Sequence, residues 1–231
     1  MRTGIVLLAR LASTRLPAKT LAPIGRRVIL EHCLQRLIAS GVGRVILATT
    51  TRDEDDVLAR IARRYGALVT RGDGDDVLGR TWQAAQEFDL ELVLRATGDN
   101  PGVDIQTPGR VVAALRATGA DYVVEEGLPY GAAVEGMTAA ALEYAADAAT
   151  DPYDREHVTT FIRRRTDLFR VVMPLAPAPL RRPELRLTVD TAEDLAWLRE
   201  LFARSGSDIP SLRELIEVAG RAGHAVHDEV A

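Results

Sequence analysis

Short apolar runs alternate along the chain with stretches in which apolar residues recur every three or four positions. The runs predict strands, and the helical spacing predicts helices between them. The predicted strands are 3–9, 44–49, 67–70, 91–96 and 121–124, and the predicted helices are 28–40, 53–65, 76–88 and 107–118. This alternation predicts an α/β fold, with a mostly parallel sheet, helices on both faces and right-handed crossovers.

The regular alternation stops after residue 124. Residues 125–135 predict a loop, because Gly127, Pro129 and Gly131 fall within them. Helices are predicted at 138–149, 154–165, 191–204 and 212–222, strands at 168–173 and 186–189, and an irregular proline-rich stretch at 175–183. We therefore expect a single domain, 1–231, in which approximately residues 125–185 form an inserted segment for acceptor binding and dimer contact.

Composition narrows the class of protein. With 47% hydrophobic and 27% charged residues, the chain is typical of a globular protein. A net charge of −4 argues against a general nucleic-acid partner. No apolar run approaches the roughly 18 residues of a membrane span, and we find no signal peptide. The single cysteine, Cys33, fits a reducing compartment, so we expect a cytoplasmic protein without a membrane partner.

Lys19 is the only lysine among the 29 basic residues. It lies with Arg10 and Arg15 in the loop after the first predicted strand, where open α/β sheets bind ligands. An ammonium is a compact point charge and a guanidinium is a planar fork, so together they suit a polyphosphate. A solvated basic loop is the ordinary alternative. The loop is not a Walker motif, because GxxxxGK[ST] is absent.

Two aspartates also follow predicted strands. Asp99 comes after strand 91–96, and Asp190 comes between strand 186–189 and the next helix. Carboxylates in such places can hold Mg²⁺, which also bridges substrate phosphates. The alternatives are a turn-forming role for Asp99 and a helix N-cap for Asp190. Whether the two carboxylates converge is left open by the sequence.

Three motifs carry a resemblance to a known family: A-R-x-x-S-T-R-L-P-x-K at 9–19, R-x-T-G-D-x-P at 95–101 and T-V-D-T-x-E-D-L at 188–195. They resemble the acylneuraminate cytidylyltransferase family, and within it the spore-coat polysaccharide biosynthesis F type. The CMP-3-deoxy-octulosonate synthetases are similar too. The resemblance covers about residues 3–203. It implies a Rossmann-like nucleotidyltransferase fold of the glycosyltransferase-A type. It also implies a homodimeric, Mg²⁺-dependent enzyme that transfers CMP from CTP to a sugar acid and releases pyrophosphate.

The resemblance also implies roles for individual residues. The catalytic cations would be Arg10, Arg15 and Lys19, and the metal ligands would be Asp99 and Asp190. The nucleotide would be bound by Ala9, Arg10, Ser13, Arg15, Lys19, Arg80 and Asp99, and the acceptor by Arg95, Glu135, Arg155 and His157. Ala133 stands where the family often has an aspartate, and this departure leaves the identity of the acceptor open.

Two other functions remain open on the residues alone. A pyrophosphorylase that joins GTP, UTP or dTTP to a sugar 1-phosphate or a phosphorylated small acid would use the same chemistry at phosphorus. A non-catalytic nucleotide-binding module would bind nucleotide without releasing pyrophosphate. A dehydrogenase is not indicated, because Gly41-Val42-Gly43 lacks the third glycine and precedes a strand. Zinc and serine-hydrolase motifs are absent.

Overall fold

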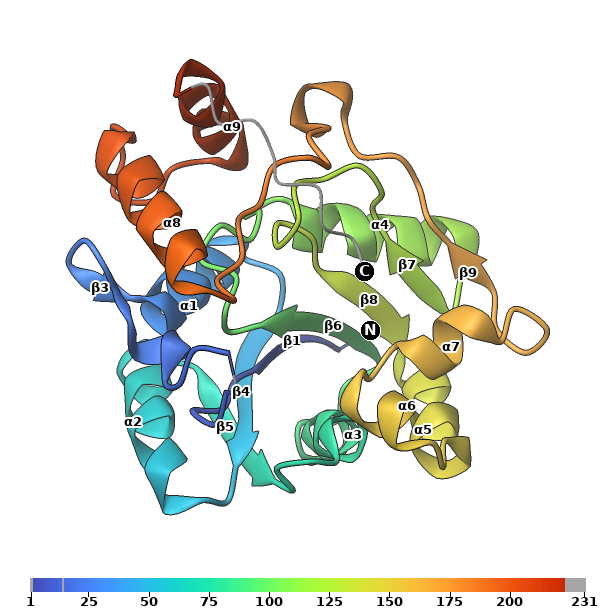
Figure 1. The fold of residues 1–231 in the computed structure, drawn as a ribbon. Coiled ribbons are helices and arrows are strands. Elements are labelled where there is room, and N and C mark those ends of the chain that lie inside the picture. Colours follow the sequence, from blue (N-terminus) through green and yellow to red (C-terminus); the bar gives the residue numbers. More distant parts are fainter. Residues whose placement is uncertain (1, 14, 223–231) are drawn as a thin grey trace.

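The computed structural model describes residues 2–13 and 15–222 and is built around a seven-stranded sheet (Figure 1). The strand order is β5-β4-β1-β6-β8-β7-β9. The strands are β1 (Thr3–Leu8), β4 (Arg44–Thr50), β5 (Leu68–Gly72), β6 (Leu92–Thr97), β7 (Tyr122–Val124), β8 (Glu135–Thr138) and β9 (Val171–Val172). Strands β5, β4, β1 and β6 run parallel, and β8 is antiparallel to β6 and β7. The predicted α/β fold with a mostly parallel sheet is confirmed.

Helices cover both faces of the sheet because its strands are apolar on both sides. Along β1, Ile5 and Leu7 belong to one core, and Val6 and Leu8 belong to the other. The first core packs against α1 (Ile29–Ala39), α2 (Asp56–Arg64), α4 (Thr107–Thr118), α8 (Ala192–Arg204) and α9 (Leu212–Arg221). The second packs against α3 (Val77–Glu87), α5 (Ala139–Ala148) and α7 (Thr160–Arg164), and α6 (Pro152–Glu156) lies beside α3.

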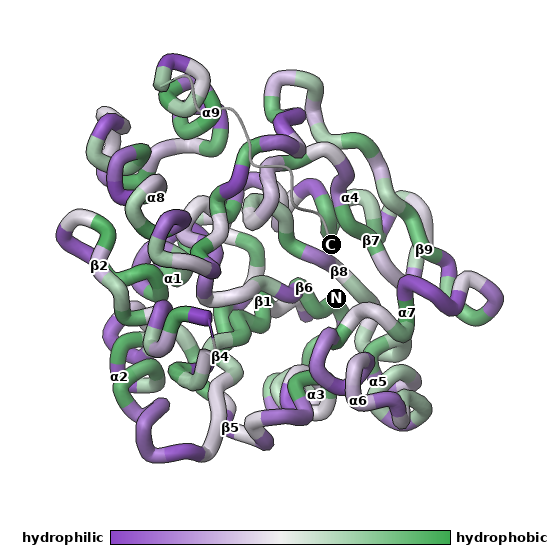
Figure 2. The backbone as a smooth tube through the Cα atoms, viewed as in Figure 1, coloured by the Kyte–Doolittle hydropathy of each residue, from purple (hydrophilic) through white to green (hydrophobic). Residues whose placement is uncertain are grey.

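The helices that pack on the sheet bury an apolar face and expose a polar one. Hydrophobic and hydrophilic residues alternate along α8 and α9 (Figure 2), and the buried residues of α9 include Leu212, Leu215 and Ile216. Cys33 lies on the buried face of α1, and burial raises the pKa of its thiol. In the part of the chain that the structure describes, no helix combines the length and apolar character needed to cross a bilayer.

The predicted helix 154–165 is wrong, because the chain forms two short helices, α6 and α7. Between them Val158, a β-branched residue, has a positive φ of 34°. The buried carboxylate of Asp154 spans the interruption: it accepts a hydrogen bond from the Thr160 hydroxyl at 2.7 Å and pairs with Arg164. These contacts join the two short helices across the break, and His157 lies within the break.

The predicted strand 186–189 is also wrong. This segment is extended and crosses from one loop to another: the Leu187 N–H donates to the Tyr130 carbonyl at 2.7 Å, and the Val189 N–H donates to the Asp99 carbonyl at 2.9 Å. The predicted strand 168–173 shortens to β9. The sequence pattern missed β8 and the two-residue strands β2 (Pro23–Ile24) and β3 (Arg27–Val28), which are too short for a periodic signal.

Candidate active site

The carboxyl ends of β1 and β6 open into a cavity of about 360 Å³. The loops that follow these strands pack closely, since the Gly98 N–H donates to the Leu8 carbonyl at 2.8 Å. A Cβ on Gly98 would lie 2.8 Å from that of Ala9, so only glycine fits there. All the sequence-predicted nucleotide residues line this cavity: Ala9, Arg10, Ser13, Arg15, Lys19, Arg80 and Asp99. Thr14 lies outside the described residues.

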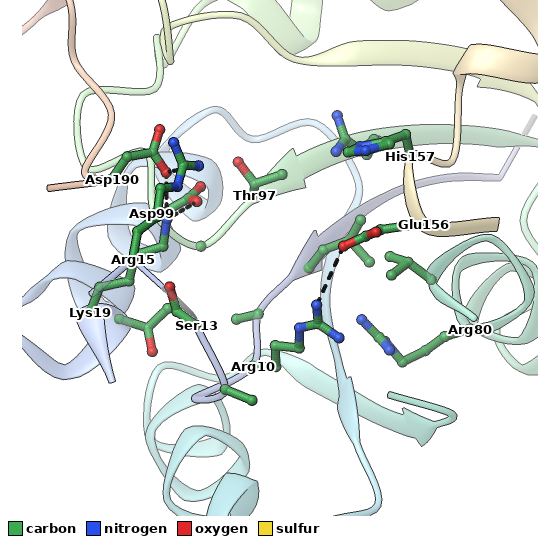
Figure 3. Close-up of a pocket in the computed structure, with 17 residues that line it drawn as sticks. Arg10, Ser13, Arg15, Lys19, Arg80, Thr97, Asp99, Glu156, His157 and Asp190 are labelled. Carbon is green, nitrogen blue, oxygen red and sulfur yellow. Dashed lines mark hydrogen bonds and ion pairs between the residues drawn. The ribbon is translucent and has the colours of Figure 1, made fainter. Parts of the chain in front are cut away.

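Lys19 joins the two predicted metal-ligand aspartates. Its Nζ lies 2.8 Å from Asp99 Oδ2 and 2.8 Å from Asp190 Oδ1 (Figure 3). Burial alone would lower the pKa of Lys19, but the charges of Asp99 and Asp190 and their hydrogen bonds outweigh it, and the pKa is raised. The structure thus brings together three residues that lie far apart in sequence, and Lys19 is fully protonated at neutral pH.

Asp190 is the most heavily paired member of this cluster. Its Oδ1 also accepts from Arg15 Nη2 at 2.8 Å, and its Oδ2 accepts from Arg186 Nη2 at 2.6 Å. The helix N-cap alternative for Asp190 is not what the structure has, because Thr191 caps α8 through its side chain. Sequence reasoning missed Arg186, and its spacing of four residues from Asp190 was no signal, because residues four apart face each other on a helix and this segment is not helical.

The cluster of Lys19, Asp99 and Asp190 offers some, but not all, of the oxygen ligands that a divalent metal ion needs. Among the described residues, no group of three or more His, Cys, Asp or Glu side chains could hold a metal ion. Two carboxylates, Asp99 and Asp190, are oxygen ligands of the kind Mg²⁺ prefers, and Mg²⁺ usually completes its shell with water and substrate phosphate. The residues therefore fit a metal that arrives with a phosphate ligand.

A second group of polar residues occupies the other end of the cavity. Arg10 Nη1 donates to the Gly74 carbonyl at 2.6 Å, and its Nη2 lies 3.5 Å from Glu156 (Figure 3). Arg80 is only 2% exposed and donates to the Asp73 carbonyl. Burial, followed by the charge of Arg10, lowers the pKa of Arg80, and its Nε has no partner among the described residues.

A second cavity, of about 520 Å³, adjoins the first. The two cavities share one wall, which consists of Arg15, Arg95, Thr97, Asp99, His157 and Asp190. The exposed ring of His157 packs against Tyr153, with ring centroids 4.2 Å apart. Of the predicted acceptor residues, Arg95, Glu135 and His157 line the second cavity. Arg155 lines neither cavity: it pairs with Asp76 at the start of α3 and donates to the Ala146 carbonyl.

Glu135 and Arg95 form an ion pair in the floor of the second cavity. Arg95 Nη1 donates to Glu135 Oε2 at 2.8 Å, and the Tyr122 hydroxyl donates to Oε1 at 2.9 Å. Burial would raise the pKa of Glu135, but the charge and hydrogen bond of Arg95 and the hydrogen bond of Tyr122 outweigh it, so the pKa is lowered. Glu135 is therefore ionised at neutral pH, and each of its carboxylate oxygens accepts a hydrogen bond from a neighbouring side chain.

This lowered pKa predicts an acid-dependent contribution to stability. A carboxylate with a depressed folded-state pKa stabilises the fold above its ordinary value, 4.5 for glutamate, and loses that contribution as the pH falls through the folded-state value. We expect Glu135→Gln to cost about 3–5 kcal/mol at pH 7, because it leaves Arg95 without its charge partner. Urea unfolding from pH 7 to pH 3.5 should show this difference shrinking below pH 4.5, whereas exposed Glu143→Gln should have no effect. A pH-independent difference would contradict the assignment.

One cation that lines the second cavity has no ion-pair partner in the part of the chain that the structure describes. Arg15 pairs with Asp190 and Arg95 pairs with Glu135, but the exposed side chain of Arg163 makes no ion pair or hydrogen bond with the described residues. Its charge nevertheless contributes to the lowered pKa of Glu135. Sequence reasoning missed Arg163, because it lies in a run of three arginines, 163–165, that reads as a solvated surface.

The sequence and the fold of this chain are similar to those of known cytidylyltransferases. A family model described as cytidylyltransferase matches residues 4–217. The spore coat polysaccharide biosynthesis protein SpsF of Bacillus subtilis is 32% identical and covers 98% of this chain and 97% of its own length. A 3-deoxy-manno-octulosonate cytidylyltransferase of Mesorhizobium japonicum is 32% identical and covers 88% and 100%. The solved structure of a cytidylyltransferase from Leptospira borgpetersenii superposes with a TM-score of 0.91 at 30% identity, over 100% of this chain and 99% of the other.

Proposed function

This chain belongs to the cytidylyltransferase family, and we propose that it transfers CMP from CTP to a sugar acid with release of pyrophosphate. One observation carries the proposal: Lys19, Asp99 and Asp190 meet where two cavities adjoin. A reaction that joins two substrates needs two adjacent sites and concentrated charge at their boundary. In this proposal the first cavity takes CTP and the second takes the acceptor.

The roles of the chain's own residues follow from this arrangement. An acceptor oxygen attacks the α-phosphorus in line, and the bond from that phosphorus to the pyrophosphate oxygen breaks. The cations Arg10, Arg15 and Lys19 stabilise the charge that accumulates on the departing pyrophosphate. All three line the first cavity, which supports this role.

A divalent metal ion belongs to this proposal. Nucleotidyltransferases generally depend on one, and Asp99 and Asp190 would hold it as Mg²⁺. When bound, the ion would neutralise the negative charge of the phosphate groups at the wall that the two cavities share. Asp190 presents one oxygen to Lys19 and Arg15 and uses the other to bind Arg186, so its orientation is already set.

Residues 125–185 supply most of the lining of the second cavity, including Glu125, Tyr130 and Arg163. We therefore assign acceptor binding to this segment. The unpaired guanidinium of Arg163 favours an acceptor with an acidic group, because a guanidinium binds a carboxylate through charge-assisted hydrogen bonds. The homodimer and the cytoplasmic location remain parts of this proposal.

Arg163 therefore provides a test of the acceptor class. With a sugar acid that supports turnover, we expect Arg163→Gln to raise the acceptor KM by about 10–100-fold, the usual worth of a hydrogen bond to a charged group. The KM for CTP should stay unchanged, because Arg163 does not line the first cavity. Steady-state pyrophosphate release measures both constants. Exposed Arg116→Gln on α4 is the matched control. An unchanged acceptor KM in Arg163→Gln would contradict this role.

The proposed function itself is tested by nucleotide-dependent stabilisation followed by turnover. Thermal unfolding is measured with CTP, UTP, GTP, ATP and dTTP, each with Mg²⁺ or with EDTA. A ligand at 100 times its Kd stabilises by about 2.7 kcal/mol, so we expect a shift with CTP that EDTA diminishes. Pyrophosphate release is then screened against sugar acids. A shift confined to another nucleotide would favour the pyrophosphorylase alternative and contradict the proposal.

A further inference from the structure

Arg186 contacts two residues that line the second cavity, Tyr130 and Asp190. Its Nη2 donates to Asp190 Oδ2 at 2.6 Å, and its Nε donates to Asp194 Oδ1 at 2.7 Å. Its guanidinium carbon also lies 4.9 Å from the ring centroid of Tyr130, which lines the second cavity. Arg186 is not among the described residues that line either cavity. It therefore acts on the site through other residues.

Asp194 fixes the backbone of the same aspartate. Its Oδ2 accepts hydrogen bonds from the backbone N–H groups of Asp190 at 2.8 Å and Thr191 at 2.9 Å. Asp194 is itself held at the start of α8 by a reciprocal capping arrangement with Thr191. Asp190 is thus held twice: by Asp194 at its backbone and by Arg186 at Oδ2. The remaining oxygen, Oδ1, faces Lys19 and Arg15.

We propose that Arg186 is a positioning residue that holds the Asp190 carboxylate in the orientation needed to bind the nucleotide-associated metal ion. This inference rests on the proposed function. A guanidinium can bond two carboxylates at once through its planar fork, and an ammonium cannot reproduce that geometry. The Asp190 side chain is only 9% exposed, so its carboxylate depends on protein groups such as Arg186 for hydrogen bonds. The Tyr130 ring lies within cation–π distance of the same guanidinium, which adds a third contact to it.

The test measures metal binding, not turnover. Mn²⁺ is titrated into the CTP-loaded protein without acceptor, and water-proton relaxation enhancement reports the ion bound to protein. We expect Arg186→Met to weaken Mn²⁺ binding by about 10–100-fold, the usual effect of removing a group that orients a metal ligand. Arg186→Lys should recover part of the loss. The control is Arg182→Met, because Arg182 lies in the same segment, is half-exposed and lines neither cavity.

A double variant separates positioning from general structural damage. In an Asp190→Asn background, Arg186→Met should cause little further loss of the residual Mn²⁺ affinity, because Arg186 acts through Asp190. The inference would be overturned if Arg186→Met bound Mn²⁺ as tightly as the wild-type protein. It would also be overturned if Arg186→Met lost the same Mn²⁺ affinity in the wild-type background and in the Asp190→Asn background. Should Arg186→Met not fold, Arg186→Lys and Arg186→Gln carry the comparison. Absence of Mn²⁺ binding in the CTP-loaded wild-type protein would instead overturn the proposed function.

Discussion

Lys19→Met is expected to lower kcat/KM for CTP by about 10²–10³-fold, the typical cost of losing one group that stabilises transition-state charge. Methionine keeps much of the length of lysine and removes the ammonium, which lies 2.8 Å from both Asp99 and Asp190. The same variant removes the positive charge between the two carboxylates: Asp99 loses its ion-pair partner among the described residues, and Asp190 keeps Arg15 and Arg186. We therefore expect it to bind Mn²⁺ more tightly than the wild-type protein when nucleotide is absent. Initial rates of pyrophosphate release and Mn²⁺ titration measure the two effects.

Two further variants show what Lys19 contributes. Lys19→Arg keeps the charge but replaces a point charge by a fork, so its rate should lie between those of the wild-type protein and Lys19→Met. Arg26→Met, an exposed position outside both cavities, is the control and should retain the wild-type rate. Near-wild-type turnover in Lys19→Met would refute the assignment of Lys19 to the leaving pyrophosphate.

Asp99→Asn and Asp190→Asn should each reduce kcat by about 10²-fold or more and raise the metal concentration needed for half-maximal rate, because an amide keeps the shape of the carboxylate and loses its charge. Groups that act as a unit are not additive, so the double variant should be only slightly slower than the slower single variant. Asp190→Asn should also lower the melting temperature more than Asp99→Asn. Asp190 pairs with Lys19, Arg15 and Arg186, whereas Asp99 pairs with Lys19 alone among the described residues.

The measurement is the rate of pyrophosphate release across a range of Mg²⁺ concentrations, together with a melting curve for each variant. Asp89→Asn is the matched control: Asp89 is exposed, pairs with Arg2 and has a positive φ of 53°, which asparagine tolerates. Wild-type metal dependence in both single variants would refute the assignment of Asp99 and Asp190 to the metal.

Local sequence patterns determined most of the elements. The β1 run is apolar at every position from Ile5 to Leu8 because both faces of the strand are buried, and such runs between helical repeats predict a parallel sheet. Helix α4 begins and ends at the predicted residues, Thr107 and Thr118, since Pro108 suits its first turn and Gly119, with a φ of 63°, ends it. Composition drew attention to the loop that follows β1, because Lys19 is the only lysine in the sequence, and this loop lines the first cavity.

The features that local patterns missed depend on distant partners. Strand β8 contains only four residues, including Gly136, and exists because β6 and β7 pair with it on either side. The break at Val158 is spanned by the ion pair between Asp154 and Arg164, which no helical periodicity indicates. Arg155 likewise pairs with Asp76, a residue far away in the sequence, so no local pattern predicts where its side chain lies.

The sequence by itself singled out Lys19, Asp99 and Asp190 as candidates for phosphate chemistry, because each lies in the segment that follows a predicted strand. Only the tertiary structure decided that they meet. Strand β1 lies beside β6, which brings Lys19 to Asp99, and the extended segment before α8 hydrogen-bonds to the Asp99 backbone, which brings Asp190 to both. The physical reason is that periodicity and capping depend on neighbours within a few residues, whereas convergence depends on sheet order and on chain segments that return from a distance.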